Sequence, residues 1–434
     1  MPDDGRSAER ATSMPVSGFV KEAPRRTPVA QTCDVCVLGG SCTGVFAAVR
    51  AAQTGARVAL VEKQNAFGGV ATSGLVAIWH RLTDRNGDRT IIGGLTRTMI
   101  DRLTEIGACD AEGWDHGFNI NSEELKIELD RLVVDYGITP YLHTIYASPL
   151  IEGRKVKAVF IENKSGRQAV RADVFVDATG DGDLARDAGI PFAVRDGLQP
   201  PTTCADIQGL PGNIGDLIRA HREEFGLAED SGWATPIPGT KDVRMCALTH
   251  VFGTDASDAR QLTAAEIEGR RQVRACMDIA RKYGGAHDRP ALLDLCSYIG
   301  IRETRSFTAD YVLTEEDVLS CRRFPDAIAN GSYHVDVHDP RTGAFRFKEP
   351  RGDFYQIPLS TMVSGRAENV IMAGRMISTD RSAFGAIRVM VNLNQVGEAA
   401  GVTASLAASG EIAVAEVDAA SVRERLSELG ALVI

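Results

Sequence analysis

Apolar runs separated by glycine-containing turns mark the first strands and helices of this chain. The run Cys33–Leu38 is largely apolar and leads into glycines, and the segment from Gly44 to Gly55 carries alanines at helical spacing. A second apolar run, Val58–Val61, follows. Short apolar runs bounded by turns predict buried strands. We therefore predict a strand, a glycine-rich turn, a helix and a second strand over residues 33–62.

The same signals continue to residue 177. Leucine and valine recur every three or four positions between Asn121 and Gly137, which predicts an amphipathic helix with Gly137 at its C-cap. Three strands with turns between them are then predicted, at Thr139–Tyr146, Lys155–Glu162 and Gln168–Asp177.

The regular pattern stops at about Pro191 and returns near Asn369. Between them, a helix over Ala264–Tyr283 is predicted among irregular segments. After them comes a short apolar strand ending in Gly374-Arg375, and then one long helix from Gly385 to Ala408. Small residues form one stripe of that helix and predict close packing; they are Gly397, Ala400, Gly401 and Ala404.

This organisation predicts an α/β protein whose nucleotide-binding domain is interrupted by an insertion. We expect a Rossmann-like domain with an inserted α+β cap that binds substrate. The expected boundaries are a flexible leader at 1–32, the first part of the nucleotide-binding domain at 33–190, the cap at 191–353, and a return segment with C-terminal helices at 354–434.

Composition narrows the possible partners and location. The net charge of −10 argues against a nucleic-acid partner, which would require a basic face. No apolar run approaches the roughly 20 residues that span a membrane, and residues 1–32 lack the apolar core of a signal peptide. The nine cysteines are scattered, as in a reduced chain. We therefore expect a cytoplasmic protein that acts on a small molecule.

The cysteines do not encode a metal or iron–sulfur site. Cys33 and Cys36 form a C-x-x-C, but residues three apart on a strand face opposite sides. They are expected to be buried structural thiols. No other closely spaced group of cysteines exists, so neither a ferredoxin-type cluster nor a four-cysteine zinc site is expected.

The turn after the first strand has the glycines of a dinucleotide site. Backbone N–H groups and a helix N-terminus at such a turn bind a pyrophosphate, and the residues expected to do so are Gly39, Gly40, Ser41, Cys42, Thr43 and Gly44. Ser41 replaces the second glycine of the fingerprint. Its hydroxyl is expected to cap the helix or to donate to a phosphate oxygen. Glu62 ends the next strand, where a carboxylate accepts from ribose hydroxyls and disfavours NADP.

Several ordered motifs together resemble a known family. They are Leu38-Gly39-Gly40 with Gly44, Glu62-Lys63, Gly68–Thr72, Asp177–Asp183, Arg302–Arg305, and Ala373–Arg375 through Met390. Over residues 33–408 the chain is similar to the FAD-dependent oxidoreductases often grouped with the FAD-binding subunit of heterodisulfide reductase. The resemblance implies FAD and a glutathione-reductase-type FAD domain. Further FAD contacts are then implied for Lys63, Gly69, Thr179, Gly180, Asp181, Gly374 and Arg375.

Candidates for the reacting site are fewer. His80 follows the loop expected near the flavin and is either an acid/base or substrate ligand, or a structural histidine. On an extended segment Arg302 and Thr304 share one face, while Glu303 and Arg305 share the other. Arg302 and Arg305 either anchor a substrate carboxylate or join the cap to the FAD domain by ion pairs. Arg388 is expected to contact the flavin or substrate, or to form an ion pair.

One further pattern is ambiguous. His334, Asp336 and His338 would share one face of a strand, a spacing that suits metal ligands. A polar strand face or a ligand-facing cap wall is the interpretation we favour, and no metal is expected.

The sequence as a whole predicts a flavin-linked dehydrogenase or oxidase. A small organic substrate would exchange a hydride with flavin N5. No second glycine-rich turn for NAD(P)H is present, so the electron acceptor stays open among O2, a quinone and a protein carrier. A non-redox flavoprotein, such as an isomerase or hydratase, and an electron-transfer component of a larger complex are the alternatives.

Overall fold

The computed structural model describes residues 18–227, 232–285, 289–341 and 345–434. Most of the expected leader, residues 1–17, lies outside the described residues, and the first strand begins at Val29 rather than Cys33. The strands are β1 (Val29–Leu38), β2 (Val58–Val61), β3 (Ile78–Trp79), β4 (Cys109–Gly113), β5 (Gly117–Ile120), β6 (Thr139–Tyr141), β7 (Ile145–Glu152), β8 (Lys155–Asn163), β9 (Gly166–Asp177), β10 (Phe192–Val194), β11 (Ala205–Gln208), β12 (Trp233–Pro236), β13 (Val243–Ala247), β14 (Ala291–Leu295), β15 (Arg305–Phe307), β16 (Ala327–Gly331), β17 (Val335–His338), β18 (Phe345–Lys348), β19 (Tyr355–Pro358) and β20 (Val370–Met372).

Ten α-helices are found among the described residues. They are α1 (Cys42–Gln53), α2 (Gly94–Glu105), α3 (Ser122–Asp135), α4 (Asp183–Asp187), α5 (Ile214–His221), α6 (Ala259–Tyr283), α7 (Glu315–Leu319), α8 (Arg381–Ile387), α9 (Met390–Gly410) and α10 (Ala419–Glu428). None of these described helices is long and apolar enough to cross a membrane.

A seven-stranded mixed sheet organises the larger part of the molecule. Its strand order is β6-β2-β1-β9-β8-β7, and β20 also pairs with β9. The pairs among β6, β2, β1, β9 and β20 are parallel, whereas β7, β8 and β9 form an antiparallel meander. Strand β9 serves both parts, because its first half pairs with β8 and its last residues pair with β20. The expected α/β fold with a parallel sheet is confirmed.

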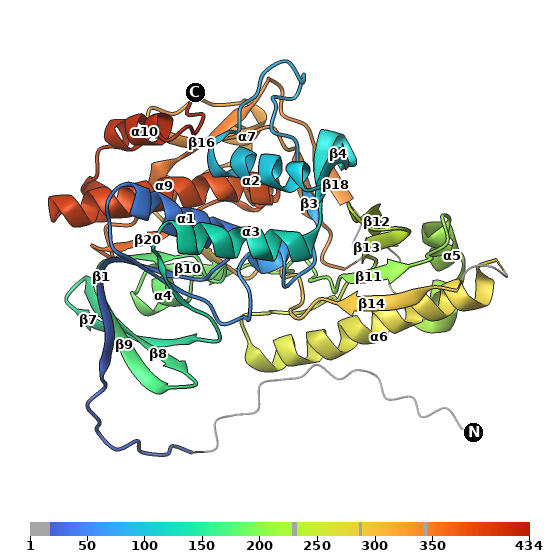
Figure 1. Ribbon diagram of the computed structural model, residues 1–434, viewed down its shortest axis with the longest axis horizontal. Coiled ribbons are helices and arrows are strands. Elements are labelled where there is room, and N and C mark those ends of the chain that lie inside the picture. Colours follow the sequence, from blue (N-terminus) through green and yellow to red (C-terminus); the bar gives the residue numbers. More distant parts are fainter. Residues whose placement is uncertain (1–17, 228–231, 286–288, 342–344) are drawn as a thin grey trace.

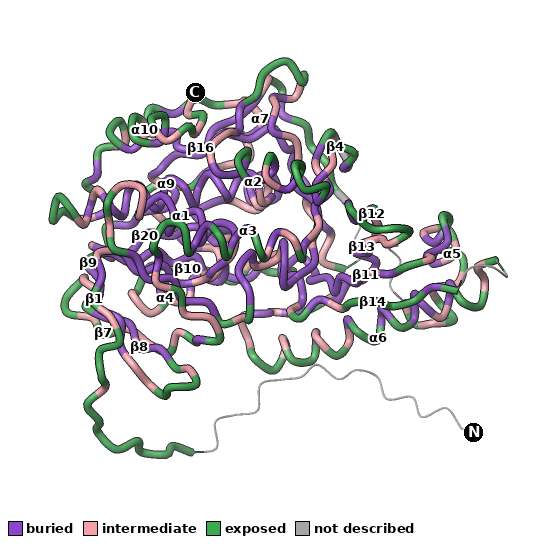
Figure 2. Tube along the Cα trace, in the orientation of Figure 1, coloured by how far each residue is buried: buried purple, intermediate pink, exposed green. Residues whose placement is uncertain are grey.

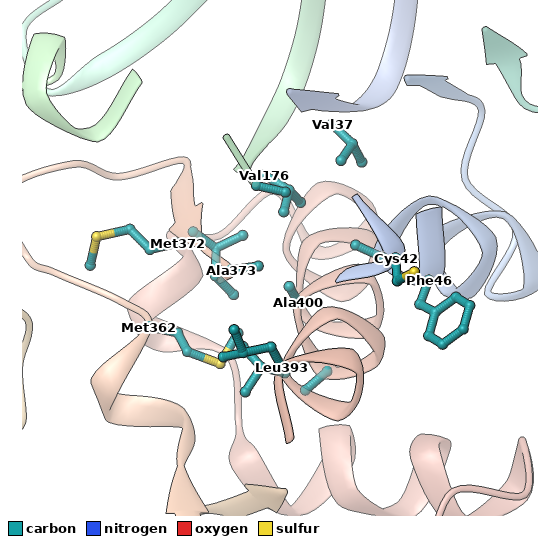
Figure 3. Close-up of a cluster of buried hydrophobic side chains, with 14 of the residues drawn as sticks. Val37, Cys42, Phe46, Val176, Met362, Met372, Ala373, Leu393 and Ala400 are labelled. Carbon is teal, nitrogen blue, oxygen red and sulfur yellow. The ribbon is translucent and has the colours of Figure 1, made fainter. Parts of the chain in front are cut away.

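Helices α1 and α9 pack tightly against each other beside this sheet (Figure 1). A Cβ atom at Gly397 would overlap the carbonyl oxygen of Thr43, and one at Gly401 would overlap that of Ala47. The predicted close packing of the small-residue stripe is therefore confirmed. The core continues from this contact into β1, β9 and β20, as Figure 3 shows for Val37, Val176, Met372 and Ala400.

Two predicted elements are wrong in their extent. The strand Thr139–Tyr146 is divided into β6 and the start of β7, because His143 N–H and Thr144 N–H donate to the carbonyls of Gln64 and Glu62 and turn the chain. The helix Gly385–Ala408 is divided into α8 and α9, with Val389 in an extended conformation (ψ 144°) between them. This second break brings Arg388 to the surface of a cavity described below.

A smaller unit projects from the main body, at the right of Figure 1. Its antiparallel sheet has the order β12-β13-β11-β14, and α5 and α6 pack against it through a separate apolar cluster that includes Ile207, Ile218 and Met277. Helix α6 begins at Ala259, five residues before the predicted start, because the Asp258 carboxylate caps it by accepting from two backbone N–H groups.

The remaining part of the expected cap packs elsewhere. Hydrophobic residues from Phe307 to Val363 belong to the main cluster, together with β1, β9 and α9. The separate clusters contain residues only up to Ile301. Figure 2 shows the continuous buried interior of the main body and the more exposed projecting unit.

All nine cysteines lie in the described part of the chain, and all are free thiols. Cys33 and Cys36 are both buried in β1, as expected. Burial raises the pKa of the Cys33 thiol to about 12, so this cysteine is protonated and unreactive at neutral pH.

Candidate functional site

A cavity of ≈ 910 Å³ lies where the carboxyl ends of the parallel strands meet the projecting unit. Open α/β sheets bind ligands at this end of their strands. One wall comes from the β1–α1 turn, the end of β2 and the segment after β9; the other comes from β12, β13, β17 and the segment 298–302. The volume is at the upper end of those of small-molecule sites.

The β1–α1 turn is shaped by its glycines. Gly39 has φ +96°, and a Cβ there would overlap the Ala178 carbonyl; a Cβ at Gly44 would overlap the Gly39 carbonyl. Both positions therefore require glycine. Ser41 caps α1, because its Oγ accepts from Gly44 N–H at 3.3 Å. The cap uses the hydroxyl as an acceptor and leaves its hydrogen able to donate to a ligand.

Glu62 is fixed at the end of β2. One carboxylate oxygen accepts from Gly40 N–H at 2.6 Å and the other from Gln64 N–H at 2.8 Å. The side chain lines the cavity and is only 7% exposed. The neighbouring Lys63 also lines the cavity, and its Nζ lies 4.9 Å from the ring centroid of Tyr298.

The segment after β9 meets the segment after β20. Gly180 has φ +79° and its Cα faces the Arg375 guanidinium, which forms an ion pair with Asp181. The buried Asp177 carboxylate organises the turn by accepting from Thr179 Oγ1 at 2.7 Å and Ala185 N–H at 2.8 Å. Burial raises the pKa of Asp177 to about 6, although these hydrogen bonds oppose the rise.

Polar side chains gather on the wall opposite the nucleotide turn. Asp336 lies at their centre: its Oδ2 accepts from Arg388 at 2.8 Å and from the Tyr333 hydroxyl at 3.2 Å, and lies 3.5 Å from His338 Nε2. His80 packs edge-on against Tyr333, with ring centroids 4.3 Å apart. All five of these residues line the cavity.

The histidines of this group are neutral at physiological pH. Burial, with a further contribution from Arg388, lowers the pKa of His80 to about 3. Burial and the charge of Arg302 lower the pKa of His338 to about 3. Burial alone would raise the pKa of Asp336, but Arg388 and His338 hold it below its ordinary value, so the carboxylate is ionised.

The segment 302–305 divides between the two roles considered for it. Arg302 lines the cavity, and its Nη1 donates to Pro200 O and Thr202 Oγ1, each at 2.5 Å. Arg305 does not line the cavity and forms an ion pair with Asp183 at 2.9 Å. Thr304 and Arg305 both bond to Asp181, so the predicted alternation of faces is wrong at these two positions.

The other predicted positions separate in the same way. The predicted FAD contacts that line the cavity are Gly39, Ser41, Cys42, Thr43, Glu62, Lys63, Gly69, Thr179, Gly180, Gly374, Arg375 and Arg388. Those that stand behind it are Gly40, Gly44 and Asp181. His334 precedes β17, with Nδ1 3.9 Å from Glu349 Oε1. Within the described ranges, no group of three or more potential ligands is placed to hold a metal.

Several lining residues carry no motif and were missed. Trp233 and Thr235 come from β12, Tyr298 from the segment after β14, and Asn394 from the second turn of α9. The amide nitrogen and oxygen of Asn394 are both buried without a hydrogen-bond partner. Its only sequence signal is its position six residues after Arg388.

The donor set fits a dinucleotide cofactor that ends in a polar ring. The glycine turn offers backbone N–H groups, and Glu62 offers an acceptor. Farther along the cavity, Asn394 has both a donor and an acceptor unused, as does the hydroxyl of Ser73. Buried polar atoms of this kind require partners, and a flavin ring edge provides both kinds.

Comparison with known proteins identifies a family. Residues 34–426 match the family model described as FAD dependent oxidoreductase. No curated protein sequence matches the chain.

Solved structures resemble it only distantly. A geranylgeranyl bacteriochlorophyll reductase-like protein from Thermoplasma acidophilum is 12% identical, with a TM-score of 0.47 over 92% of this chain and 83% of that one. The p-nitrophenol 4-monooxygenase from Pseudomonas putida is 12% identical, with a TM-score of 0.45 over 92% and 84%. Anhydrotetracycline hydroxylase from Streptomyces rimosus is 14% identical, with a TM-score of 0.43 over 92% and 66%.

Proposed function

The chain belongs to the FAD-dependent oxidoreductase family, and on this premise we propose that it oxidises or reduces a small organic substrate held between FAD and the projecting unit. One observation carries the proposal. A single cavity joins the glycine turn and Glu62 to a wall that contains His80, Arg302 and Arg388. Cofactor and substrate would therefore share one enclosed space.

Residues of the main body would hold the cofactor. Backbone N–H groups of the turn after Gly39, together with the N-terminus of α1, suit the pyrophosphate. Glu62 suits the adenosine ribose, and the segments at Thr179–Gly180 and Gly374–Arg375 suit the remainder of the chain of FAD. We propose a glutathione-reductase-type arrangement, which the interrupted parallel sheet supports. When bound, FAD supplies a ring that accepts or returns two electrons.

The start of α9 would tune the ring. Val389 stands at the N-cap with no side-chain cap, and Val389, Met390 and Leu393 all line the cavity. The first N–H groups of this 21-residue helix are therefore directed to the cavity region, where the helix dipole favours negative charge. A ring that gains negative charge on reduction is stabilised in such a position.

The opposite wall would bind and orient the substrate. His80 and His338 are neutral, so each presents an imidazole that can accept or donate a hydrogen bond without adding charge. The apolar side chains of Val76, Ile78 and Ile301 line the same space and would exclude water from the reacting atoms. We propose His80 as the group that exchanges a proton with the substrate.

The absorbance of the purified protein tests the proposal. We expect the yellow spectrum of oxidised flavin, either as isolated or after addition of FAD, and anaerobic bleaching by the true substrate. A protein that stays colourless and takes up no FAD would contradict it. A substrate that is converted while the flavin remains oxidised would instead indicate the non-redox alternative.

A further inference from the structure

We infer that the substrate carries a carboxylate on an apolar body, and that Arg302 and Arg388 bind this carboxylate at the wall opposite the nucleotide turn. The inference rests on the proposed function, because it assigns the other end of the cavity to FAD. It names the substrate class that this site would take.

Both arginines are held in position before any ligand arrives. Arg302 Nη1 is fixed by the Pro200 carbonyl and the Thr202 hydroxyl. Arg388 Nη2 is fixed by the Asp336 carboxylate at 2.8 Å, and the Arg388 side chain is 15% exposed. The two come from distant parts of the chain, the segment after β14 and the break between α8 and α9, yet both line one cavity. Prepositioned guanidinium groups bind carboxylates with little loss of side-chain entropy.

The charges of the two arginines overlap at Asp336. Arg388 and Arg302 both lower the pKa of this carboxyl, and both also lower the pKa of His338. The neutral histidines contribute no charge, so this wall has two cations against the single carboxylate of Asp336. Glu112 also lines the cavity, but it is exposed to solvent at the surface. A ligand with one negative charge would balance the wall.

Part of the Arg388 donor capacity is unused. Its Nε is buried and has no hydrogen-bond partner, while Nη2 is occupied by Asp336. A guanidinium binds a carboxylate best through two of its N–H groups. The second cation, Arg302, gives the carboxylate a donor from another direction. The other cations that line the cavity lie at the nucleotide end, where Arg375 is paired with Asp181 and Lys63 contacts Tyr298.

The remainder of this wall is apolar or aromatic. Its side chains include Ile78, Trp233, Ile301, Tyr333 and Phe347. Such a surface suits a hydrocarbon or aromatic body rather than a sugar or a polyanion. The carboxylate would then fix the orientation of the substrate, while the apolar wall holds its body near the flavin.

Binding of simple carboxylates to the FAD-loaded protein tests the inference. The probes are benzoate and phenylacetate, each compared with its amide, and binding is followed by the change in flavin absorbance and by calorimetry. We expect each acid to bind at least ten-fold more tightly than its amide. Arg302→Met and Arg388→Met should each weaken binding of the acid at least ten-fold and leave the amide unaffected, with unchanged FAD content.

Arg57→Met is the matched control, because Arg57 is an exposed arginine paired with Asp34 away from the cavity. It should bind the acids as the unmodified protein does. Equal binding of acid and amide, or full affinity in the Arg302→Met protein, would overturn the inference even if FAD is bound. If Arg388→Met does not fold, Arg302→Met and the acid–amide comparison still decide it. A protein that takes up no FAD would contradict the proposed function instead, and calorimetry with the same acids would then test the arginines alone.

Discussion

Replacement of Glu62 by alanine should weaken FAD binding more than it weakens the fold. Each Glu62 oxygen accepts one backbone N–H, from Gly40 and from Gln64, and the carboxylate lies at the cavity surface where a ribose would bind. Loss of a charged hydrogen bond to the ribose costs about 1–3 kcal/mol, which corresponds to a rise of about 5- to 150-fold in the Kd for FAD.

Comparison of two substitutions separates this contact from the local structure. Glu62→Ala also leaves the N–H groups of Gly40 and Gln64 without their acceptor, so the apoprotein should lose about 1–3 kcal/mol of stability. Glu62→Gln keeps one acceptor oxygen and should fall between alanine and the native residue in both respects. Glu152→Ala, at an exposed position on β7, is the control. The assays are fluorescence titration of apoprotein with FAD and denaturant unfolding without FAD.

Unchanged FAD affinity in Glu62→Ala would refute this role. In that case the ribose does not contact this carboxylate, and Glu62 only fixes the turn between β1 and α1. A loss of stability with no loss of FAD affinity is the signature of that purely structural role.

Three further outcomes follow from the structure. Gly401→Ala should destabilise the protein by about 1–3 kcal/mol because its Cβ would overlap the Ala47 carbonyl, whereas Gly410→Ala, near the end of the same helix with only ordinary contacts, should not; equal unfolding midpoints would refute the packing. Ser41→Ala should cost α1 about 1 kcal/mol of capping energy and Ser41→Gly only a few tenths, and if both lower FAD affinity equally, the hydroxyl donates to the cofactor. Since burial lowers the pKa of folded His80 to about 3 from its ordinary 6.5, the unfolded chain binds more protons between these values, and stability should fall as pH falls through this range; in His80→Asn the pH dependence of Tm should be shallower, and an identical slope would show that His80 does not contribute.

The part of the site made by backbone was predictable from sequence, for a physical reason. A turn that approaches another backbone closely admits only glycine, so Gly39 and Gly44 are visible in the sequence itself. The stripe at Gly397 and Gly401 is visible in the same way. Residue type reports the geometry directly at such positions.

The errors came from hydrogen bonds between distant residues. No glycine or proline marks the break between α8 and α9. The Ala386 carbonyl instead accepts from the Tyr355 hydroxyl at 2.9 Å and from Asn392 Nδ2 at 3.2 Å, and this carbonyl is the one that a continuous helix would offer to the N–H of Met390. A tyrosine 31 positions away in the chain therefore ends α8, and local propensity holds no record of it.

The same limit explains why the substrate wall was only partly predicted. Alternation along residues 302–305 could not decide which arginine faces the ligand, because the answer depends on where Pro200, Thr202 and Asp183 lie in the fold. Backbone chemistry binds the part of the cofactor that is common to a whole family, whereas side chains brought together by long-range packing select the substrate. The break at Arg388 is therefore more than an irregularity of a helix. It exposes the start of α9 to the cavity and places a cation beside Asp336 in one step, so Tyr355, which does not line the cavity, helps to position the substrate wall.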